Sequence, residues 1–595
     1  MKVPIIWDYD IDENFKTLLF NSNISGIPLI YSVPVDLSEE PKQINSGREP
    51  VMMASISNDG KNLIYFQDEA GNEKFQLYLI PVAGGNPKPL TEKDQRTITI
   101  GWHPNGKEIV RSYVSTGAPI IETIDLQTKE TALLKETSPI ALDLHFSPDG
   151  KWLALTNMKK ITNTEVMIIN IEDPSDIIIY NLSDKTEECF PSWSPDSKKL
   201  AYLSNINGWR QVVIQEFQRD DKIFLELDKD EEVPEPSYRG DAVIWDPKGD
   251  KVYYIISKYS RTTLHSHQIT GMRSTALPFP QGTLISPRIS KNGKFITVLH
   301  SSMMSPFGIY IHELGTNNLF PLTSRKFDID ISQLKEPQSV WYESFDGRKI
   351  HAWHLPAIET KVPYPAVVHS HGGPWYQTYD SWLQGIILHI PFQNGFAVLS
   401  PNFRGSIGYG SEFQYLDLRD PGGGDLEDIV NGVKWLKKQP EIDNKKIGIL
   451  GASYGGYMPL IALTKKPDVF NWGISMVPVV DFVQDYKLAD ALFKQFNITL
   501  LGGPPRGKYR ELYIDRSPIT HISKIKAPVL IMAGMADSRC PWPPIENFIN
   551  ELKKMNHPHK LAIVEKAGHV SSQLNHSEII PIVSKMLEFI KNIIK

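Results

Sequence analysis

The chain has 595 residues, with 63 basic side chains against 69 acidic ones and only two cysteines. A chain of this length is too long for one hydrophobic core, and at about 150 residues per domain it predicts two to four domains. The charges nearly cancel and form no long block of one sign, which argues against nucleic acid and anionic membranes as partners.

The N-terminal sequence MKVPIIWDYDIDENF lacks the apolar core of a signal peptide, and no apolar run of 18 residues occurs in the sequence. Cys189 and Cys540 are the only cysteines, which excludes a disulfide framework and favours a reducing compartment. We therefore expect a soluble protein of the cytoplasm.

A turn followed by a strand recurs through the first half of the chain. Six copies are clear: SNDGKNLIYF from Ser57, HPNGKEIVRS from His103, SPDGKWLALT from Ser147, SPDSKKLAYL from Ser194, DPKGDKVYYI from Asp246 and SKNGKFITVL from Ser290. A degraded seventh copy, DIDENFKTLLF, begins at Asp10. Successive copies are 44 to 52 residues apart when they are aligned at Asn14, Gly60, Gly106, Gly150, Ser197, Gly249 and Gly293.

The copies continue with a second β-rich run, such as QLYLIPV from Gln76 or GIYIHEL from Gly308. Short strands with Pro-Asp-Gly turns at a period in the forties are typical of propeller blades, each a four-stranded sheet. Seven copies predict a seven-bladed β-propeller over residues 1–325. A β-sandwich built of hairpins is the alternative, but a sandwich has no reason to keep one fixed period.

In the second half, apolar runs alternate with helical patterns. The strand candidates are PAVVHSHG, FAVLSPNF, KIGILGAS, WGISMVPV, APVLIMAG and KLAIVEKA, and the helix candidates include DLEDIVNGVKWLKKQ and SEIIPIVSKMLEFIKNIIK. This alternation predicts a mostly parallel sheet with helices on both faces, over residues 326–595. The reactive groups of such sheets gather at the carboxyl ends of the strands.

One serine, Ser453, lies between two glycine pairs where a strand pattern gives way to a helix pattern. The five residues from Gly451 to Gly455, GASYG, have the form of a nucleophile elbow. By composition alone, G-x-S-x-G should occur in roughly one chain of this length in six, so the motif by itself is only a hypothesis. Pro459, six residues into the helix, removes one backbone donor and predicts a mild kink.

Two further strand ends supply the partners that a nucleophilic serine needs. Asp537 follows APVLIMAG, and His569 follows the strand KLAIVEKA. The order Ser, Asp, His is that of the α/β-hydrolases, and it predicts a triad of Ser453, Asp537 and His569. Other candidates are less well placed, because they fall in a helix pattern, beside a proline or in the first strand of the half: Asp425, Asp428, His557, His559, His351 and His354.

The combined motifs resemble the prolyl oligopeptidase family of serine peptidases, and most closely its acylaminoacyl-peptidase-like branch. The resemblance covers the whole chain and rests on HGGP from His371, NFRGSIGYG from Asn402, GASYGGY from Gly451, DSRCP from Asp537 and GHV from Gly568. The chain departs from the family pattern at Met535-Ala536, where His-Gly is usual, and at Val570, where glycine is frequent. Neither departure removes a catalytic group.

The pattern predicts acyl transfer, with Ser453 as nucleophile, His569 as base and Asp537 as the residue that orients the imidazole. The backbone N–H of Tyr454, at a helix N-terminus, is the expected first oxyanion donor. By resemblance, the second donor is Gly373 in the HGGP loop.

Substrate binding is also inferred from the resemblance. It implies that Arg539 binds a substrate carbonyl, that His371 belongs to the substrate-binding residues, and that Phe482, Phe493 and Phe496 line an apolar pocket. A surface salt bridge for Arg539 and core packing for the three aromatic residues remain the alternatives.

The expected function is hydrolysis of short peptides, with the propeller restricting substrate size. A carboxylesterase or amidase that uses the same triad is the alternative, and a propeller that serves only as a protein-binding platform is a third. A dipeptidyl-peptidase would need acidic residues that bind a free amine; DEEVPEP from Asp230 could supply them, but a solvated loop is the simpler expectation. Nothing in the sequence resembles a metal or cofactor motif, so we expect no cofactor, peptides as partners, and a possible homo-oligomer.

Overall fold

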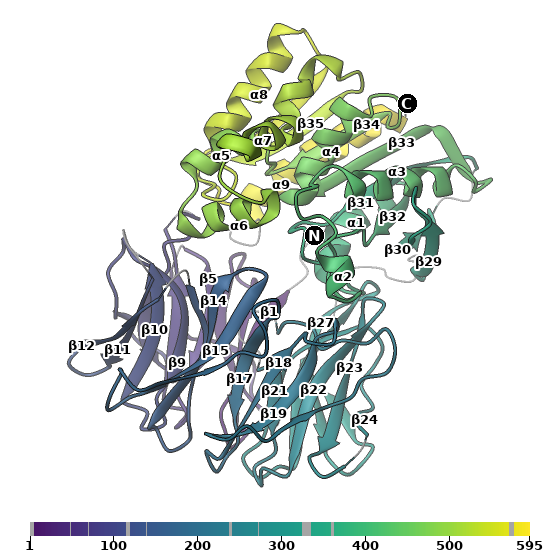
Figure 1. The fold of residues 1–595 in the computed structure, drawn as a ribbon. Helices are drawn as coiled ribbons and strands as arrows, with labels where there is room; N and C mark the ends of the chain where they lie inside the picture. Colours follow the sequence, from purple (N-terminus) through teal and green to yellow (C-terminus); the bar gives the residue numbers. More distant parts are fainter. Residues whose placement is uncertain are drawn as a thin grey trace. The chain divides into compact units, whose positions relative to one another are not determined.

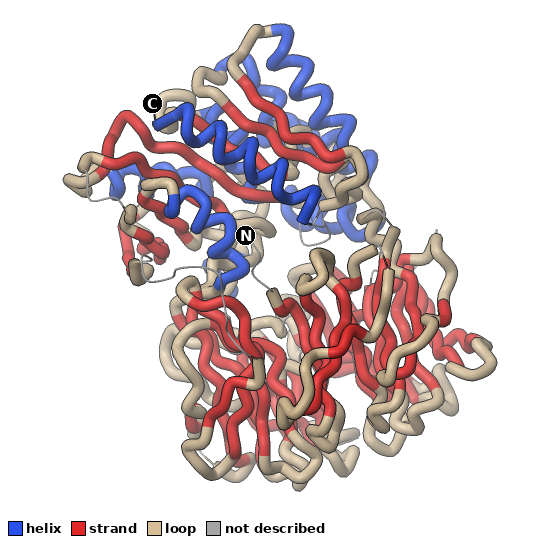
Figure 2. The backbone as a smooth tube through the Cα atoms, turned by 180° about the vertical axis from the view of Figure 1, so that it is seen from behind, coloured by secondary structure: helices blue, strands red, loops and turns tan. Residues whose placement is uncertain are grey.

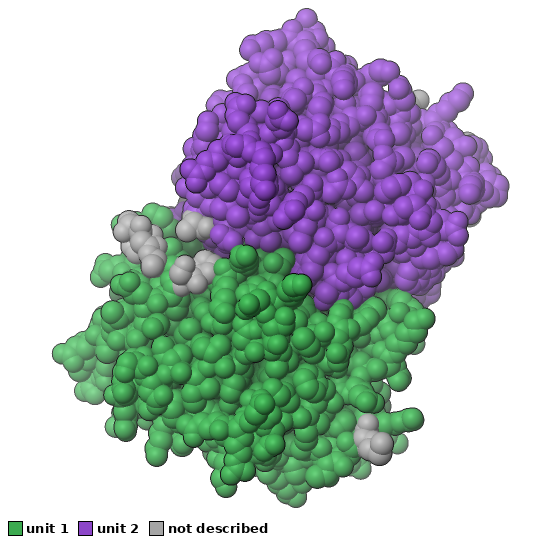
Figure 3. All heavy atoms as spheres, viewed as in Figure 1, with its two compact units in different colours: residues 1–69, 73–329 green, residues 70–72, 330–595 purple. Residues whose placement is uncertain are grey.

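The computed structural model describes residues 5–594 except 48, 70, 115–118, 138–139, 237–240, 272, 324–334, 359–361 and 570–575. The chain forms two compact units, residues 1–69 with 73–329 and residues 70–72 with 330–595 (Figure 1, Figure 3). The predicted boundary at residues 325/326 lies outside the described residues.

Within its described residues, unit 1 consists of seven four-stranded sheets, each built from four consecutive strands. The strands are β1 Ile6–Ile11, β2 Thr17–Ser22, β3 Leu29–Pro34 and β4 Lys42–Gln43; β5 Val51–Ile56, β6 Asn62–Gln67, β7 Gln76–Pro81 and β8 Lys88–Pro89; β9 Arg96–Trp102, β10 Glu108–Val114, β11 Ile120–Asp125 and β12 Thr131–Glu136; β13 Ile140–Phe146, β14 Trp152–Lys160, β15 Asn163–Asn170 and β16 Ile177–Tyr180; β17 Glu188–Trp193, β18 Lys199–Ser204, β19 Gln211–Glu216 and β20 Lys222–Phe224; β21 Val243–Trp245, β22 Lys251–Lys258, β23 Arg261–Gln268 and β24 Thr275–Ala276; and β25 Thr283–Ile289, β26 Phe295–Ser302, β27 Ser305–Glu313 and β28 Leu319–Pro321. The predicted seven-bladed propeller is confirmed.

The repeated turn joins the first and second strands of each blade. In blade 2 the N–H of Gly60 donates to the carbonyl of Ser57 over 2.8 Å, and the Ser57 hydroxyl donates to Asp59 over 2.7 Å. Gly60 has a φ of 71°, a left-handed conformation that glycine adopts without steric cost. In the degraded first copy this position is Phe15, with a φ of 54°, so the alignment at Asn14 is wrong by one residue.

Blade 1 packs against blade 7, and among the described strands neither blade takes a strand from the other. The hydroxyl of Tyr9 on β1 donates to the carbonyl of Ser286 over 2.7 Å and lies 3.0 Å from the hydroxyl of Thr297. The N–H of Lys291, in the repeated turn of blade 7, donates to the carbonyl of Glu13 over 3.0 Å. Side-chain and turn contacts of this kind therefore join the two ends of the array.

The segment that begins at Asp230 is not the solvated loop expected from its charges. Glu232 is 3% exposed and Val233 is 1% exposed. The backbones of Glu232 and Ser257 exchange two hydrogen bonds, which tie the segment to β22. The expectation was wrong because backbone pairing to a neighbouring strand outweighs the polar composition here.

Unit 2 contains a sheet of eight described strands in the order β29-β30-β32-β31-β33-β34-β35-β36. Neighbours from β32 to β36 run parallel, whereas β29 and β30 form an antiparallel edge. The strands are β29 Gln338–Glu343, β30 Lys349–Leu355, β31 Tyr364–Ser370, β32 Ala397–Pro401, β33 Ile442–Ala452, β34 Trp472–Met476, β35 Val529–Gly534 and β36 His559–Val564. The predicted parallel sheet is confirmed, and the antiparallel edge is an addition to it.

Helices cover both faces of this sheet. From the side of Figure 1, α3 and α4 lie in front of it, and Figure 2 shows the C-terminal helix α9 in front of the opposite face. The helices are α1 Trp382–Gln393, α2 Ser411–Gln414, α3 Gly424–Leu436, α4 Tyr454–Lys465, α5 Phe482–Leu488, α6 Ala491–Leu501, α7 Arg510–Arg516, α8 Trp542–Lys554 and α9 His576–Ile594, with short 3-10 turns at Gly507–Tyr509 and Pro518–Lys524. Among the described helices, none combines the length and the apolar character needed to span a membrane.

Candidate active site

Ser453 lies at the turn between β33 and α4, in a conformation that costs on the order of 1–3 kcal/mol for a residue with a side chain: φ is 61° and ψ is −123°. The flanking glycines are required because carbonyl oxygens press against them. A Cβ atom on Gly451 would lie 2.2 Å from the oxygen of Gly455, and one on Gly455 would lie 2.1 Å from the oxygen of Ser370. The close packing of three backbone segments therefore explains the glycines around the serine.

Helix α4 runs continuously through Pro459, from Tyr454 to Lys465. The proline leaves the carbonyl of Gly455, four residues back, without its usual N–H donor. The hydroxyl of Ser370, at the end of β31, donates to that carbonyl over 2.7 Å. A buried side chain on a neighbouring strand thus replaces the lost backbone bond in the first turn after the nucleophile.

Ser453, Asp537 and His569 form one chain of hydrogen bonds. The Oγ of Ser453 lies 2.9 Å from Nε2 of His569, and Nδ1 of His569 lies 2.7 Å from Oδ2 of Asp537. Because an ionised carboxylate only accepts, we assign the ring proton to Nδ1, which leaves Nε2 to accept from the serine hydroxyl. The three residues follow β33, β35 and β36, at the carboxyl ends of parallel strands.

The loop after β35 fixes the carboxylate of Asp537. Its Oδ1 accepts hydrogen bonds from the backbone N–H groups of Arg539 and Cys540, over 2.8 and 2.9 Å. The side chains of Asp537 and His569 are 1% and 7% exposed. Since little water reaches the pair, the attraction between the carboxylate and a protonated imidazole is stronger there than in solvent.

The competing histidines and aspartates have other partners. His351 contacts Ser339 and Tyr409, His354 contacts Gln338, and His557 contacts the carbonyl of Ala527. His559 lies in β36, where its Nδ1 contacts the carbonyl of His557. Asp425 and Asp428 lie in α3, as their helical pattern predicts.

The two predicted oxyanion donors lie on separate loops. Tyr454 is the first residue of α4, where a backbone N–H has no partner within the helix. Gly373, in the loop after β31, has a φ of 74°. A Cβ atom added to its neighbour Gly372 would lie 3.5 Å from the Cβ of Ser453, so this loop lies against the nucleophile.

The predicted substrate-binding role of His371 is not what the structure indicates. The ring is 2% exposed and stacks on Phe403 with centroids 4.2 Å apart. Its Nδ1 lies 3.0 Å from the carbonyl of Gly372, and its Nε2 lies 2.8 Å from the hydroxyl of Ser406. Burial lowers the pKa of His371 to about 4, so the ring is neutral at pH 7. The side chain therefore positions the loop that carries Gly373.

Two buried carboxyl groups hold Tyr454, a predicted donor residue, and Trp375, two residues after the other predicted donor, Gly373. Asp425 accepts from the hydroxyl of Tyr454 over 2.5 Å, and Asp417 accepts from the indole N–H of Trp375 over 3.1 Å. Burial, countered in part by the hydrogen bond from Tyr454, raises the pKa of Asp425 to about 6. Burial and the charge of Asp425 raise the pKa of Asp417 well above its usual range.

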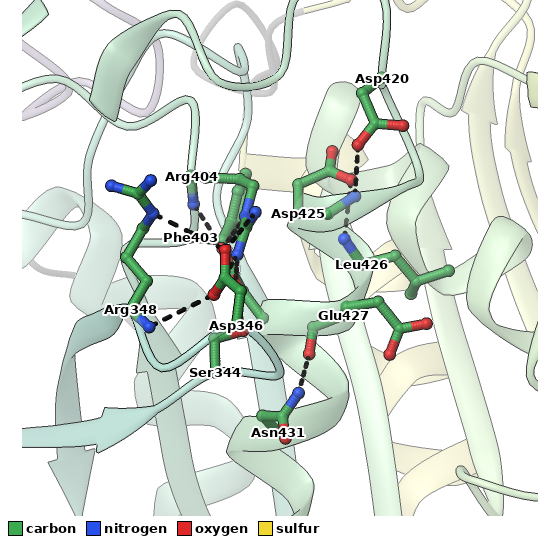
Figure 4. Close-up of polar contacts among 12 residues, drawn as sticks. Ser344, Asp346, Arg348, Phe403, Arg404, Asp420, Asp425, Leu426, Glu427 and Asn431 are labelled. Carbon is green, nitrogen blue, oxygen red and sulfur yellow. Dashed lines mark hydrogen bonds and ion pairs between the residues drawn. The ribbon is translucent and has the colours of Figure 1, made fainter. Parts of the chain in front are cut away.

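The NFRG segment ties the loop after β32 to α3. The guanidinium of Arg404 donates to both oxygens of Asp428, over 2.8 and 2.9 Å. It also contacts Asp346 (Figure 4). Arg404 is 6% exposed, and Asp428 is fully buried. A bidentate pair of this kind fixes the geometry of the loop, which contains Ser406, the partner of His371.

The predicted specificity residues separate into two groups. The guanidinium carbon of Arg539 lies 5.7 Å from the ring centroid of Phe493, and Phe496 packs against Trp375 with centroids 5.2 Å apart. Phe482 is 1% exposed and packs edge-on against Tyr457 in the core. Its assignment to a substrate pocket is therefore replaced by core packing.

Sequence reasoning missed Asp417, Ser370 and Ser406, and it treated Asp425 only as a competitor for the triad. The run of three glycines before Asp425 does mark a tight helix start, but it does not reveal which side chain the carboxyl will meet. The other three are single polar residues without a spacing signal, and only the folded chain brings them to the active-site loops.

Comparisons with known proteins agree with this arrangement. The family model for the prolyl oligopeptidase family matches residues 386–595. An uncharacterized peptidase, YuxL, of Bacillus subtilis is 32% identical over 258 residues, which is 40% of this chain and 36% of the relative. The acylamino-acid-releasing enzyme of Rattus norvegicus is 28% identical over 36% of this chain and 30% of its own length. The C-terminal part of the chain, residues 386–595, is therefore similar to the prolyl oligopeptidase family.

Other similarities extend over both units. Dipeptidyl aminopeptidase BIII of Pseudoxanthomonas mexicana is 23% identical over 94% of this chain and 83% of the relative. A solved puromycin-hydrolyzing peptidase of Mycobacterium tuberculosis superposes with a TM-score of 0.86 at 18% identity, covering all of this chain and 94% of the other. That structural likeness shows the fold alone. The chain thus spans most of one curated relative but only about a third of the other two, YuxL and the acylamino-acid-releasing enzyme.

Proposed function

We propose that this chain is a peptidase that hydrolyses short peptides through an acyl-enzyme. The observation that carries the proposal is the hydrogen-bonded chain from Asp537 through His569 to Ser453, in a protein whose C-terminal part matches a peptidase family. His569 accepts the hydroxyl proton as Ser453 Oγ attacks the scissile carbonyl, and Asp537 stabilises the imidazolium. His569 then returns the proton to the leaving amine, and a water molecule releases the acyl group by the same steps.

In this proposal the N–H groups of Tyr454 and Gly373 stabilise the tetrahedral oxyanion. The first is supported by its place at the start of α4, and the second by the loop that lies against Ser453. Losing one such donor typically costs about 10² to 10³ in turnover. Glycine at position 373 allows the main chain to approach the reacting carbonyl closely.

We assign substrate anchoring to Arg539, whose planar guanidinium can donate to a main-chain carbonyl. Phe493 and Phe496 are proposed to contact the side chain that precedes the cut. The names of the relatives differ on the substrate's N-terminus, since one is a dipeptidyl aminopeptidase and another an acylamino-acid-releasing enzyme. The class shared by both names, a peptide with a carbonyl close to its N-terminus, is the one proposed here.

The propeller, assigned to residues 1–325, is proposed to restrict substrate size for a catalytic domain of residues 326–595. The 94% coverage by dipeptidyl aminopeptidase BIII supports a joint role, because that relative aligns along both units. A cytoplasmic location is proposed from the two cysteines, which are buried and not joined in a disulfide.

A matched substrate panel tests the proposal. Acetylated, free and internally extended chromogenic peptides are assayed beside p-nitrophenyl esters of simple acids and a folded protein, with wild type and Ser453→Ala. We expect cleavage of short peptides only, and fluorophosphonate labelling of wild type but not of the variant. Ester cleavage without peptide cleavage would favour the esterase alternative, and efficient digestion of the folded protein would remove the size restriction.

A further inference from the structure

A thiol lies beside the histidine and aspartate of the proposed triad. One ligand atom each from Asp537, Cys540 and His569 lie within 4.8 Å of one another. No other group of three such side chains occurs among the residues that the structure describes. Cys540 is 3% exposed, and its N–H donates to Asp537, so the chain places it firmly in the Asp537 loop. The proposed reaction uses the imidazole and the carboxylate but not the thiol.

We propose that Asp537, Cys540 and His569 form an inhibitory binding site for a soft or borderline divalent metal ion, with Zn²⁺ as the representative ion. The inference rests on the proposed function, because two of its three ligands belong to the proposed triad. Thiolate, imidazole and carboxylate are the three side-chain ligands that Zn²⁺ takes in proteins. Hard ions such as Mg²⁺ prefer oxygen ligands and fit this set poorly.

The spacing requires only a small adjustment. Zinc bonds of 2.0 to 2.3 Å in a tetrahedral arrangement place two ligand atoms about 3.3 to 3.8 Å apart. The three ligand atoms here are at most 4.8 Å apart, and Nδ1 of His569 lies 2.7 Å from Oδ2 of Asp537, so the longest separation must shorten and the shortest must lengthen, each by about 1 Å or less. A water molecule or a substrate atom would complete the coordination, as in zinc sites with three protein ligands.

Metal binding at this site is incompatible with the proposed proton transfer. A metal on Nδ1 of His569 displaces the single ring proton, now shared with Asp537, to Nε2, and the thiol proton of Cys540 is released to solvent. With its proton on Nε2, the neutral imidazole can no longer accept one from Ser453. A metal on Nε2 blocks the same acceptor directly. Inhibition should therefore lower the rate at saturating substrate and strengthen as pH rises.

The test compares wild type with Cys540→Ala and Cys540→Val, and uses Cys189→Ala as a control for the other buried cysteine. Metal-free enzymes are titrated with buffered Zn²⁺ and assayed for peptide cleavage. We expect wild type and Cys189→Ala to be inhibited alike, and the Cys540 variants to need at least 10- to 100-fold more Zn²⁺, since even outer-shell changes alter metal affinity by about that factor. Equal Zn²⁺ sensitivity in all four proteins would overturn the site.

A second measurement reports on the thiol without any assay of turnover. Co²⁺ bound to a thiolate gives a near-ultraviolet charge-transfer absorption, which we expect for wild type and Cys189→Ala but not for Cys540→Ala. Absence of the band in wild type would also overturn the site. Fluorophosphonate labelling of the metal-free proteins keeps the two proposals apart, because labelling of Ser453 without metal sensitivity contradicts only the metal site.

Discussion

The hydroxyl of Tyr454 donates a hydrogen bond to Oδ2 of Asp425 over 2.5 Å, so the residue after the proposed nucleophile is fixed by its side chain as well as by α4. Both residues are buried, at 3% and 0% exposure. Asp425 also accepts from the N–H groups of Gly422 and Leu426, which fixes the carboxylate itself. The position of the Tyr454 N–H thus depends on a contact 29 residues away in sequence.

Tyr454→Phe should lower kcat by about 10-fold with little change in KM. The variant loosens an oxyanion donor without deleting it, so the loss should stay below the 10² to 10³ of a whole donor. Tyr457→Phe is the matched control, since its hydroxyl donates to the carbonyl of Pro421 over 3.2 Å from the same helix. Steady-state kinetics measure kcat and KM of both variants, and thermal unfolding shows whether either variant is destabilised. An equal fall of kcat in both variants would contradict the positioning role of the Tyr454 hydroxyl.

The buried carboxyl of Asp425 should make stability depend on pH. Its pKa rises from 3.8 to about 6 on folding, so between these values the folded state keeps a proton that the unfolded state releases. Stability from this group is therefore present below pH 4 and is lost as pH rises through 6. Asp425→Asn has no carboxyl group there, so its stability does not fall with pH for this reason. Between pH 4 and pH 7, its free energy of unfolding should therefore rise by up to about 3 kcal/mol relative to that of wild type. Urea unfolding at both pH values measures the difference, and a constant difference would be the contrary result.

Much of the fold follows from sequence periodicity, but the contacts that hold the active-site loops do not. The turn motif predicts seven blades because each copy obeys local rules, as in the Ser57 to Gly60 turn. Local rules fail at Phe15, where a bulky residue takes the left-handed position, and at Glu232, whose burial depends on a neighbouring strand. The meeting of Ser453, Asp537 and His569 was predictable because strand ends of a parallel sheet converge. The contacts of Asp417 and His371 were not predictable, because only tertiary packing determines their partners.

The bond from Ser370 to Gly455 offers a test of how the elbow tolerates Pro459. Ser370→Ala leaves a buried carbonyl unpaired and should destabilise the protein by about 1–3 kcal/mol. Pro459→Ala restores an N–H that can donate to the same carbonyl, so Ser370→Ala should cost clearly less in a Pro459→Ala background. A double-mutant cycle by urea unfolding measures this coupling. Strictly additive effects would mean that the hydroxyl does not replace the missing backbone donor.

Arg539 distinguishes peptide from ester substrates. A guanidinium that donates to a substrate main-chain carbonyl helps only substrates that possess it, and a hydrogen bond to a charged group contributes about 1.5 to 3 kcal/mol. Arg539→Ala should therefore lower kcat/KM on dipeptide or acyl-amino-acid substrates by roughly 10- to 100-fold, at 1.4 kcal/mol per factor of ten. Short p-nitrophenyl esters of simple acids should be hydrolysed almost as before.

Phe493→Leu is the companion variant for this experiment. The Arg539 guanidinium lies over the ring of Phe493, so this substitution removes the aromatic ring and keeps the charge of Arg539. If the ring only orients the guanidinium, Phe493→Leu should lower kcat/KM on the same peptide substrates by less than Arg539→Ala does. Ester hydrolysis should again be unaffected. The backbone of Arg539 also donates to Asp537, so disturbance of the loop is the competing explanation for any effect of Arg539→Ala. Disturbance of Asp537 would slow every substrate, and equal losses on peptides and esters would therefore assign Arg539 to the support of that loop instead of to the substrate.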